Sequence, residues 1–195
     1  MFASVMLGIN LHPAVFLDRD GVVIENCSDY VKSWDEVVFI PGAITALQDL
    51  AASHYRIIFI TNQALIGRGI RSAEYIEALH AKIVSEICQR GGRIDASYIC
   101  PDASNVDSKC RKPAPGMLLQ AQADHKIDLA QSFLIGDNIT DIQAGKAANV
   151  TTLLVKTGWG AKFVDQIQNN PQLKSPIVEN LQDAVQFILK GATSA

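Results

Sequence analysis

The sequence contains no long apolar run, no cluster of basic residues and few cysteines. A membrane-spanning helix needs about 18 consecutive apolar residues, so we expect no membrane span and no membrane partner. The 17 Lys and Arg against 20 Asp and Glu leave a net charge of −3, which argues against binding nucleic acid through bulk electrostatics. Four scattered cysteines are too few for a disulfide scaffold. These absences favour a soluble, cytoplasmic protein.

The composition fits a single domain over residues 1–195, which we expect to be a monomer. The chain is 48% hydrophobic and 19% charged, enough apolar material to bury one core and too much for a disordered chain. Residues 1–12 lack the basic start and cleavage site of a signal peptide, and we expect a disordered leader there. Residues 160–179, with Gln, Asn and two prolines, predict an irregular surface connection.

Strand-like and helix-like segments alternate along the chain. Short, continuous apolar runs, typical of strands buried on both faces, occur at 14–17, 56–60, 97–100, 132–136 and 151–155. Helix-like segments, apolar at helical spacing or rich in alanine, occur at 43–53, 73–90, 115–125, 139–148 and from about 180 onward. This order predicts an α/β fold with a doubly wound, mostly parallel sheet of five to six strands and helices on both faces.

Polar and charged residues follow the predicted strands, either directly or within the next connection. Because the carboxyl ends of parallel strands meet at one edge of a sheet, we expect these side chains to lie together. The residues are Asp18, Asp20, Thr61, Asn62, Gln63, Arg111, Lys112 and Asp137.

These residue types suit phosphoryl transfer to a carboxylate. Two carboxylates as close as Asp18 and Asp20 can divide the roles of nucleophile and general acid–base. Together with Asp137 they repel one another unless a cation joins them, and oxygen ligands favour Mg²⁺. Lys112 can neutralise both Asp18 and the group in transfer, while Thr61 can bind a phosphoryl oxygen.

Four motifs in order resemble those of the haloacid dehalogenase-like phosphatase superfamily. They are FLDRDG at 16–21, ITNQ at 60–63, CRKPAPGML at 110–118 and IGDNITDIQAG at 135–145. The DRDG and TNQ variants, followed by I-x-R-G at 66–69, are similar to the subgroup of heptose-bisphosphate and histidinol-phosphate phosphatases. The resemblance extends from about residue 14 to 160 and implies a capless fold, because the chain has no room for a large cap.

The resemblance implies a role for each matched residue. Asp18 matches the nucleophile that forms an aspartyl-phosphate, and Asp20 matches the acid–base that protonates the leaving oxygen and then activates water. Thr61 matches the residue that holds a phosphoryl oxygen, Lys112 the lysine of the third motif, and Arg111 a substrate-binding arginine.

The same resemblance implies the ligands of Mg²⁺ and further contacts with the substrate. The Asp18 side chain, the Asp20 backbone carbonyl and Asp137 match the metal-binding positions. Apart from the resemblance, the place of Asn62 and Gln63 after the strand at 56–60 predicts that they bind the substrate, with capping of the next helix as the alternative. The implied substrate is a small sugar phosphate, first of all D-glycero-D-manno-heptose 1,7-bisphosphate, which would lose its 7-phosphate.

The chain departs from the subgroup in the segment before the third motif, within residues 100–112. Heptose phosphatases often have a zinc loop there, patterned Cys-x-His and then Cys-x-Cys. Cys100 and Cys110 keep the outer positions, but Asp102 stands in place of the histidine and Ser108 in place of a cysteine. Serine rarely binds zinc and structural sites normally have four good ligands, so we expect weak zinc binding or none.

Other functions share parts of this pattern. Histidinol-phosphate phosphatase has the same motifs and is the alternative enzyme; a nucleic-acid 3′-phosphatase is more distant and disfavoured by the acidic pI of 5.8. A non-catalytic phospho-receiver module also uses an Asp cluster, Thr and Lys, but in another order along the chain. The sequence leaves open the roles of Arg19, Cys27, Arg68 and Asp141.

Overall fold

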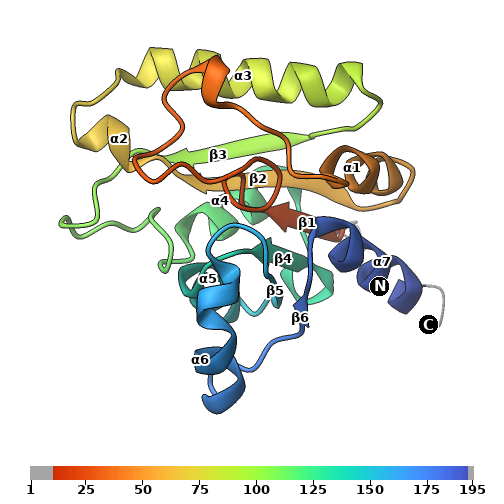
Figure 1. Ribbon diagram of the computed structural model, residues 1–195. Helices are drawn as coiled ribbons and strands as arrows, with labels where there is room; N and C mark the ends of the chain where they lie inside the picture. Colours follow the sequence, from red (N-terminus) through yellow and green to blue (C-terminus); the bar gives the residue numbers. More distant parts are fainter. Residues whose placement is uncertain (1–10, 193–195) are drawn as a thin grey trace, which may run out of the picture.

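A computed structural model describes residues 11–192, and its centre is a six-stranded, all-parallel sheet (Figure 1). The strand order is β3-β2-β1-β4-β5-β6. The strands are β1 (Ala14–Leu17), β2 (Arg56–Asn62), β3 (Ala96–Cys100), β4 (Phe133–Gly136), β5 (Thr151–Val155) and β6 (Ile177–Val178). The doubly wound α/β fold expected from the sequence is confirmed.

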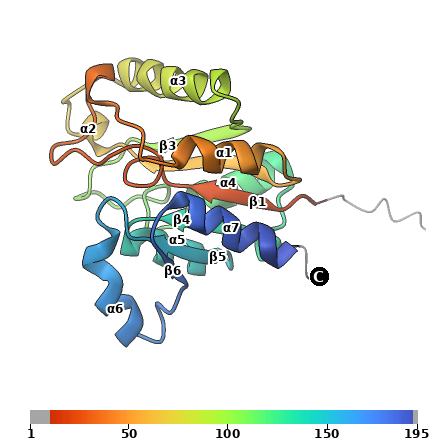
Figure 2. The ribbon, with the colours of Figure 1, turned by 45° about the vertical axis from the view of Figure 1, so that its right-hand side comes forward.

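Helices cover both faces of the sheet (Figure 2). One face packs against α1 (Ala43–Ala51), α3 (Ala73–Gln89) and α7 (Leu181–Ala192). The other packs against α4 (Gly116–His125), α5 (Ile139–Ala147) and α6 (Val164–Asn169). The short helix α2 (Ala64–Gly67) follows β2 directly, and three 3₁₀ turns lie at Trp34–Glu36, Leu129–Gln131 and Gly160–Phe163.

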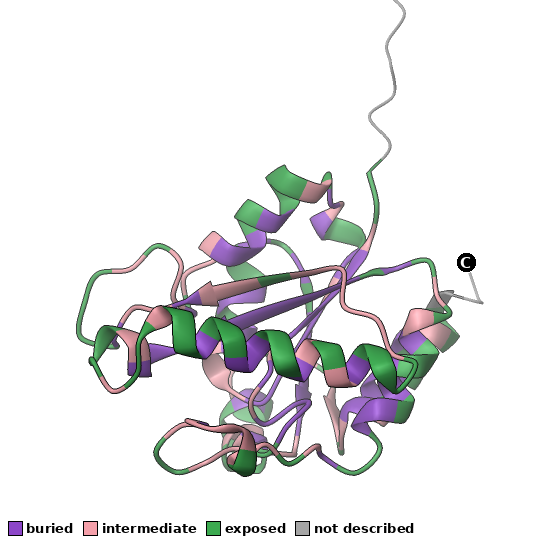
Figure 3. Cartoon of the chain, turned by 90° about the horizontal axis from the view of Figure 1, so that it is seen from above, coloured by how far each residue is buried: buried purple, intermediate pink, exposed green. Residues whose placement is uncertain are grey.

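Burial explains why the strands are continuous apolar runs. All four residues of β1 are fully buried, since helices cover it from both sides. Figure 3 shows the strands mainly in purple, while the long helices turn exposed residues outward. The edge strand β3 is only half-buried. The backbone at the carboxyl end of β1 is therefore held rigidly, which matters for the residues that follow it.

The prediction of an irregular connection over 160–179 is wrong. That segment contains a 3₁₀ turn, the six-residue helix α6 and the two-residue strand β6. Elements this short have no detectable periodicity, so tertiary packing rather than sequence pattern defines them. Most of the expected leader, residues 1–10, lies outside the described residues, whereas His12 already pairs with Ile127 next to β1. None of the helices in residues 11–192 is long and apolar enough to cross a membrane.

Candidate active site

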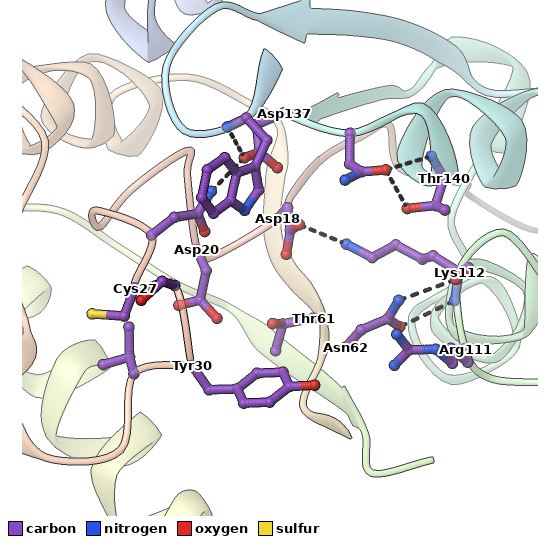
Figure 4. A pocket seen from close by; sticks show the side chains of 15 residues that line it. Asp18, Asp20, Cys27, Tyr30, Thr61, Asn62, Arg111, Lys112, Asp137 and Thr140 are labelled. Atoms are coloured by element: carbon purple, nitrogen blue, oxygen red, sulfur yellow. Dashed lines mark hydrogen bonds and ion pairs between the residues drawn. The ribbon is translucent and has the colours of Figure 1, made fainter. Parts of the chain in front are cut away.

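A cavity of about 350 Å³ opens at the carboxyl ends of the central strands (Figure 4). β1, β2 and β4 and the connection after β3 all contribute residues to its wall. Seven of the eight residues singled out from the sequence line it: Asp18, Asp20, Thr61, Asn62, Arg111, Lys112 and Asp137. The eighth, Gln63, lies beneath the wall with its side chain buried.

Lys112 connects two carboxylates at the floor of the cavity. Its Nζ lies 3.0 Å from Asp18 Oδ2 and 2.6 Å from Asp141 Oδ1, and donates to the Ile60 carbonyl at 2.9 Å. Figure 4 shows the lysine side chain extended toward Asp18. Burial alone would lower the pKa of Lys112, but the attraction of Asp141 and Asp18 raises it overall. The lysine therefore stays charged beside Asp18.

Asp141 combines a structural and an electrostatic role. Its Oδ2 accepts from the Asn138 backbone N–H at 3.1 Å, and the Asn138 side chain in turn accepts from Thr140, which closes a capping box at the start of α5. Its other oxygen faces Lys112. The sequence left the role of Asp141 open, and the structure places this residue in the first turn of α5, where it takes part in the capping box.

The side-chain amide of Asn62 holds the backbone of Lys112 in place. Asn62 Oδ1 accepts from the Lys112 backbone N–H at 3.0 Å, and Asn62 Nδ2 donates to the Lys112 carbonyl at 3.1 Å. This pair of hydrogen bonds ties the end of β2 to the loop that carries the lysine. Asn62 also lines the cavity, so a substrate contact remains compatible with this clamp.

Asp137 is oriented by two donors that the sequence analysis missed. Its Oδ2 accepts from Asn26 Nδ2 at 2.7 Å and from the Trp159 backbone N–H at 2.8 Å. Both donors lie in connecting loops, where no pattern in the sequence marks them. Only the tertiary structure identifies them. With Oδ2 occupied in this way, Oδ1 is the oxygen left for another ligand.

Two glycines allow these loops to approach Asp137. Gly21 has φ +84° and Gly158 has φ +59°, values that favour glycine. A Cβ added to Gly21 would lie 2.0 Å from Asp137 Oδ2, and one added to Gly158 would lie 2.1 Å from the same atom. Any side chain at either position would displace the carboxylate.

The acidic groups fit a bound divalent cation. Asp18, Asp137 and Asp141 each place a carboxylate oxygen within 4.8 Å of the others. Burial, together with the charges of Asp141 and Asp137, raises the pKa of Asp18 to about 8 despite the opposing effect of Lys112. Burial and then Asp141 raise the pKa of Asp137 to about 6. A cation bound by Asp18 and Asp137 would relieve this repulsion, and the all-oxygen donor set suits Mg²⁺.

Asp20 points into the cavity but is held from behind. Arg19 Nε and Nη2 donate to its two oxygens, and Gln63 Nε2 donates to Oδ2 at 2.9 Å. The same Gln63 amide donates to Thr61 Oγ1 at 2.9 Å. Because Gln63 is 1% exposed and absent from the wall of the cavity, its position favours support of Asp20 and Thr61 over the substrate contact expected from the sequence.

A disulfide joins Cys100 to Cys110 in the loop before Arg111. Around it, Ser108 Oγ donates to Asp102 Oδ2 at 2.6 Å and accepts from the Arg111 backbone N–H at 2.9 Å. The four residues at the positions of the zinc loop thus contact one another through a disulfide and hydrogen bonds. With both sulfurs in one bond they offer no thiolate to zinc, so zinc does not fit this form of the loop.

We expect the Cys100→Ser, Cys110→Ser double variant to lose about 2–3 kcal/mol of stability while keeping kcat/KM within a few-fold, because a disulfide that closes a short loop acts mainly on the unfolded chain. Chemical denaturation with and without reductant measures the first quantity, and elemental analysis measures zinc. Cys88→Ser, which removes an exposed free thiol, is the control. Near-stoichiometric zinc in the purified protein, with collapse of the double variant, would contradict this reading.

Comparison with known proteins places the chain among phosphatases. A HAD-hydrolase-like family model matches residues 109–184. The D-glycero-β-D-manno-heptose-1,7-bisphosphate 7-phosphatase of Yersinia pestis is 42% identical over 154 residues, 75% of this chain and 81% of that protein. The enzyme of that name from Pseudomonas aeruginosa is 36% identical over 148 residues, 76% of this chain and 83% of that protein.

A solved structure gives the same result for the fold. The crystal structure of the D,D-heptose 1,7-bisphosphate phosphatase from B. bronchiseptica, complexed with magnesium and phosphate, superposes with a TM-score of 0.85 at 32% identity. The match covers 92% of this chain and 99% of that one. Sequence identity of this level over most of both chains, together with the shared fold, leaves one conclusion: this chain is a HAD-like phosphatase and belongs to the D-glycero-β-D-manno-heptose-1,7-bisphosphate 7-phosphatase family.

Proposed function

We propose that this phosphatase removes the 7-phosphate of D-glycero-β-D-manno-heptose 1,7-bisphosphate through an aspartyl-phosphate on Asp18. The observation that supports this most is the contact between Lys112 Nζ and Asp18 Oδ2 at 3.0 Å on the cavity floor. A carboxylate that is 14% exposed, fixed at the end of a buried strand and paired with a cation is ready for in-line attack on a bound phosphoryl group.

In the first step, an Asp18 carboxylate oxygen attacks phosphorus and the bond between phosphorus and the sugar oxygen breaks. Asp20 gives its proton to that leaving oxygen. Lys112 and the Thr61 hydroxyl stabilise the charge on the phosphoryl oxygens as the bonds exchange. Thr61 suits this role because its oxygen already accepts from Gln63, which leaves the hydroxyl proton free to point into the cavity.

In the second step, water attacks phosphorus of the aspartyl-phosphate, and Asp20, now ionised, takes a proton from that water. The bond between Asp18 and phosphorus breaks, which releases inorganic phosphate and restores both carboxyl groups. One residue thus serves as acid and then as base. Mg²⁺, held by the Asp18 side chain, the Asp20 backbone carbonyl and Asp137, would neutralise phosphoryl charge and orient the phosphate when bound.

We expect Mg²⁺ to stabilise the protein, and more strongly at pH 8 than at pH 5. Without metal, the raised pKa values of Asp18 and Asp137, about 8 and about 6 against 3.8 in the unfolded chain, mean that the folded protein retains protons the unfolded chain has lost. Stability in EDTA should therefore fall as pH rises from about 4 to 8. Saturating Mg²⁺ at pH 8 should then raise Tm by roughly 5–10 °C.

Thermal melts across this pH range, with EDTA and with Mg²⁺, measure the effect, and activity should vanish in EDTA and return with Mg²⁺. Asp137→Asn is the matched variant, and it should lose most of the gain in Tm. A gain in Tm that is equal at pH 5 and pH 8, or full activity in metal-free buffer, would count against the proposed metal site.

The cavity supports a sugar phosphate as the substrate. Its volume of about 350 Å³ lies at the lower end of the range for small-molecule sites. Arg111 lines it close to Lys112, so a second anionic group of the substrate has a cation to meet. Tyr30 gives the cavity an aromatic surface. The guanidinium carbon of Arg68 lies 5.5 Å from the centroid of the Tyr30 ring.

A substrate panel tests this proposal. Phosphate release should be compared for the β and α anomers of heptose 1,7-bisphosphate, histidinol phosphate and a 3′-phosphorylated oligonucleotide, with ³¹P NMR to identify which phosphate leaves. We expect the β anomer to give the highest kcat/KM, with loss of the 7-phosphate. A higher kcat/KM for histidinol phosphate or the oligonucleotide would overturn the substrate assignment.

We propose further that the enzyme acts as a cytoplasmic monomer and does not bind nucleic acid. The net charge of −3 supports the absence of nucleic-acid binding. The Cys100–Cys110 disulfide is unusual for a reducing compartment, so cell fractionation, with thiol alkylation before lysis to record the redox state of the two cysteines, tests the location. Light scattering measures its oligomeric state.

A further inference from the structure

Arg19 is the largest fully buried side chain of the described residues, yet it belongs to no apolar cluster and no capping motif. Its Nε donates to Asp20 Oδ1 at 2.9 Å and its Nη2 donates to Asp20 Oδ2 at 3.0 Å. The third guanidinium nitrogen, Nη1, is buried without a partner in the structure. Burying a guanidinium is costly unless it is fully paired, so fold stability alone does not account for arginine here.

Gln63 shows the same pattern from the other side. It is 1% exposed, and its Nε2 donates both to Asp20 Oδ2 and to Thr61 Oγ1 at 2.9 Å. Its Oε1, like Arg19 Nη1, is buried and has no partner within residues 11–192. Two buried polar side chains therefore leave hydrogen-bonding capacity unused while directing their donors at one carboxylate.

No other charged group in the described chain competes for Arg19. Asp20 is its ion-pair partner, and the nearby His80 is buried with both ring nitrogens unpaired. Burial first, and then the positive charge of Arg19, lower the pKa of His80 to about 4, so the imidazole is neutral at pH 7. The guanidinium thus acts on Asp20 without being shared.

We propose that Arg19 and Gln63 are positioning residues that fix Asp20 for both proton transfers. The inference rests on the acid–base role proposed above for Asp20. A bidentate guanidinium sets the plane of a carboxylate, and the amide of Gln63, the residue that follows β2, adds a third donor. Asp20 follows β1 in a turn and its side chain is 22% exposed, so these donors are what restricts its rotation.

The donor count also assigns the oxygen that transfers the proton. A carboxylate has about four lone-pair sites, two on each oxygen. Asp20 Oδ2 accepts from both Arg19 Nη2 and Gln63 Nε2, whereas Oδ1 accepts from Arg19 Nε alone. Oδ1 therefore retains a free lone pair, and it is the oxygen that binds the proton given to the sugar oxygen and later taken from water.

The test compares leaving groups. A sugar alkoxide is a poor leaving group, so its departure depends on protonation by Asp20. The p-nitrophenolate ion is a good leaving group and depends little on it. Arg19→Met should lower kcat/KM for the heptose bisphosphate by about 10–100-fold, which is less than the loss expected when the general acid itself is removed. It should lower kcat/KM for p-nitrophenyl phosphate by less than about 3-fold. Gln63→Met should show the same selectivity at about 5–10-fold. Arg93→Met, which breaks a partly buried Arg–Asp pair outside the cavity, is the matched control. Any change in its kcat/KM should be the same for the two substrates.

A double-mutant cycle separates positioning from a structural role. In the Asp20→Asn background, Arg19→Met should cost less than about 3-fold more, because its effect passes through Asp20. Equal losses on both substrates, or losses that multiply with Asp20→Asn, would overturn the proposal. If Arg19→Met does not fold in a thermal melt, Arg19→Lys and Gln63→Met decide by the same criteria.

The cycle also distinguishes this inference from the proposed function. If Asp20→Asn shows no selective loss on the sugar phosphate, the acid–base role of Asp20 is wrong and the positioning role falls with it. If Asp20→Asn is selective and the Arg19 and Gln63 variants are not, the proposed function stands and only the positioning role is wrong.

Discussion

Asp18→Asn is expected to abolish turnover and leave the fold intact. An amide oxygen is too poor a nucleophile to attack phosphorus, and removal of a covalent nucleophile costs on the order of 10⁴-fold or more in other enzymes. The fold should persist because the variant also removes a carboxylate whose charged form is disfavoured by burial and by Asp141. Phosphate release from the heptose bisphosphate measures the loss, under conditions that exclude deamidation.

The covalent step has a more direct readout than rate. Asp20→Asn should slow hydrolysis of the intermediate, so mass spectrometry after rapid quenching should find one phosphoryl group on that variant and none when Asp18→Asn is added. Asp49→Asn, at an exposed carboxylate that bonds Gln182, is the control and should turn over normally. Near-normal turnover of Asp18→Asn would exclude the covalent mechanism.

Lys112→Met is expected to damage both activity and stability. The lysine is 2% exposed and pairs with Asp18 and Asp141, so its loss leaves two buried carboxylates without a counter-charge. Breaking a buried pair from one side typically costs about 3–5 kcal/mol. Loss of the positive charge beside the phosphoryl group should lower kcat/KM by about 10²–10³-fold, as for other electrostatic stabilisers.

A second substitution distinguishes these two effects. Lys112→Met combined with Asp141→Asn removes one of the unpaired charges, so it should recover part of the stability in denaturant titrations while activity stays low. Asp141 also caps α5, and an asparagine can still accept that hydrogen bond. If the single variant is as stable as the wild type, the buried pairs do not hold the loop as described.

The fold was largely predictable from sequence because its central strands are buried on both faces. The segments predicted at 14–17 and 151–155 have the same bounds as β1 and β5. The bounds of the other three predicted strands differ from those in the structure by one or two residues. Helix α3, expected over 73–90, ends one residue earlier, and the Ser72 side chain caps its start by accepting from the Tyr75 backbone N–H. β6 has two residues and α6 six, and such short elements are specified by neighbours rather than by their own pattern.

The candidate site was predictable where residues directly follow a strand, and not where they lie in loops. Parallel strand order brings Asp18, Thr61 and Asp137 together whatever the loops do. Asn26 and the Trp159 N–H reach Asp137 from connections whose path depends on glycines at positive φ. The disulfide could not be inferred either, because pairing depends on the distance between Cys100 and Cys110 in space.

The place of β1 in the sheet has a consequence for synthesis on the ribosome. β1 lies between β2, its neighbour in sequence, and β4, and the hydrogen bond from Ala14 to Ser132 across that second seam spans 118 residues. Until β4 has emerged from the ribosome, one edge of β1 exposes unpaired backbone donors and acceptors on a fully apolar strand. Nascent chains that end before residue 133 should therefore be the species that bind chaperones most strongly, and the nucleophile cannot be assembled with its metal-binding partner until that edge closes.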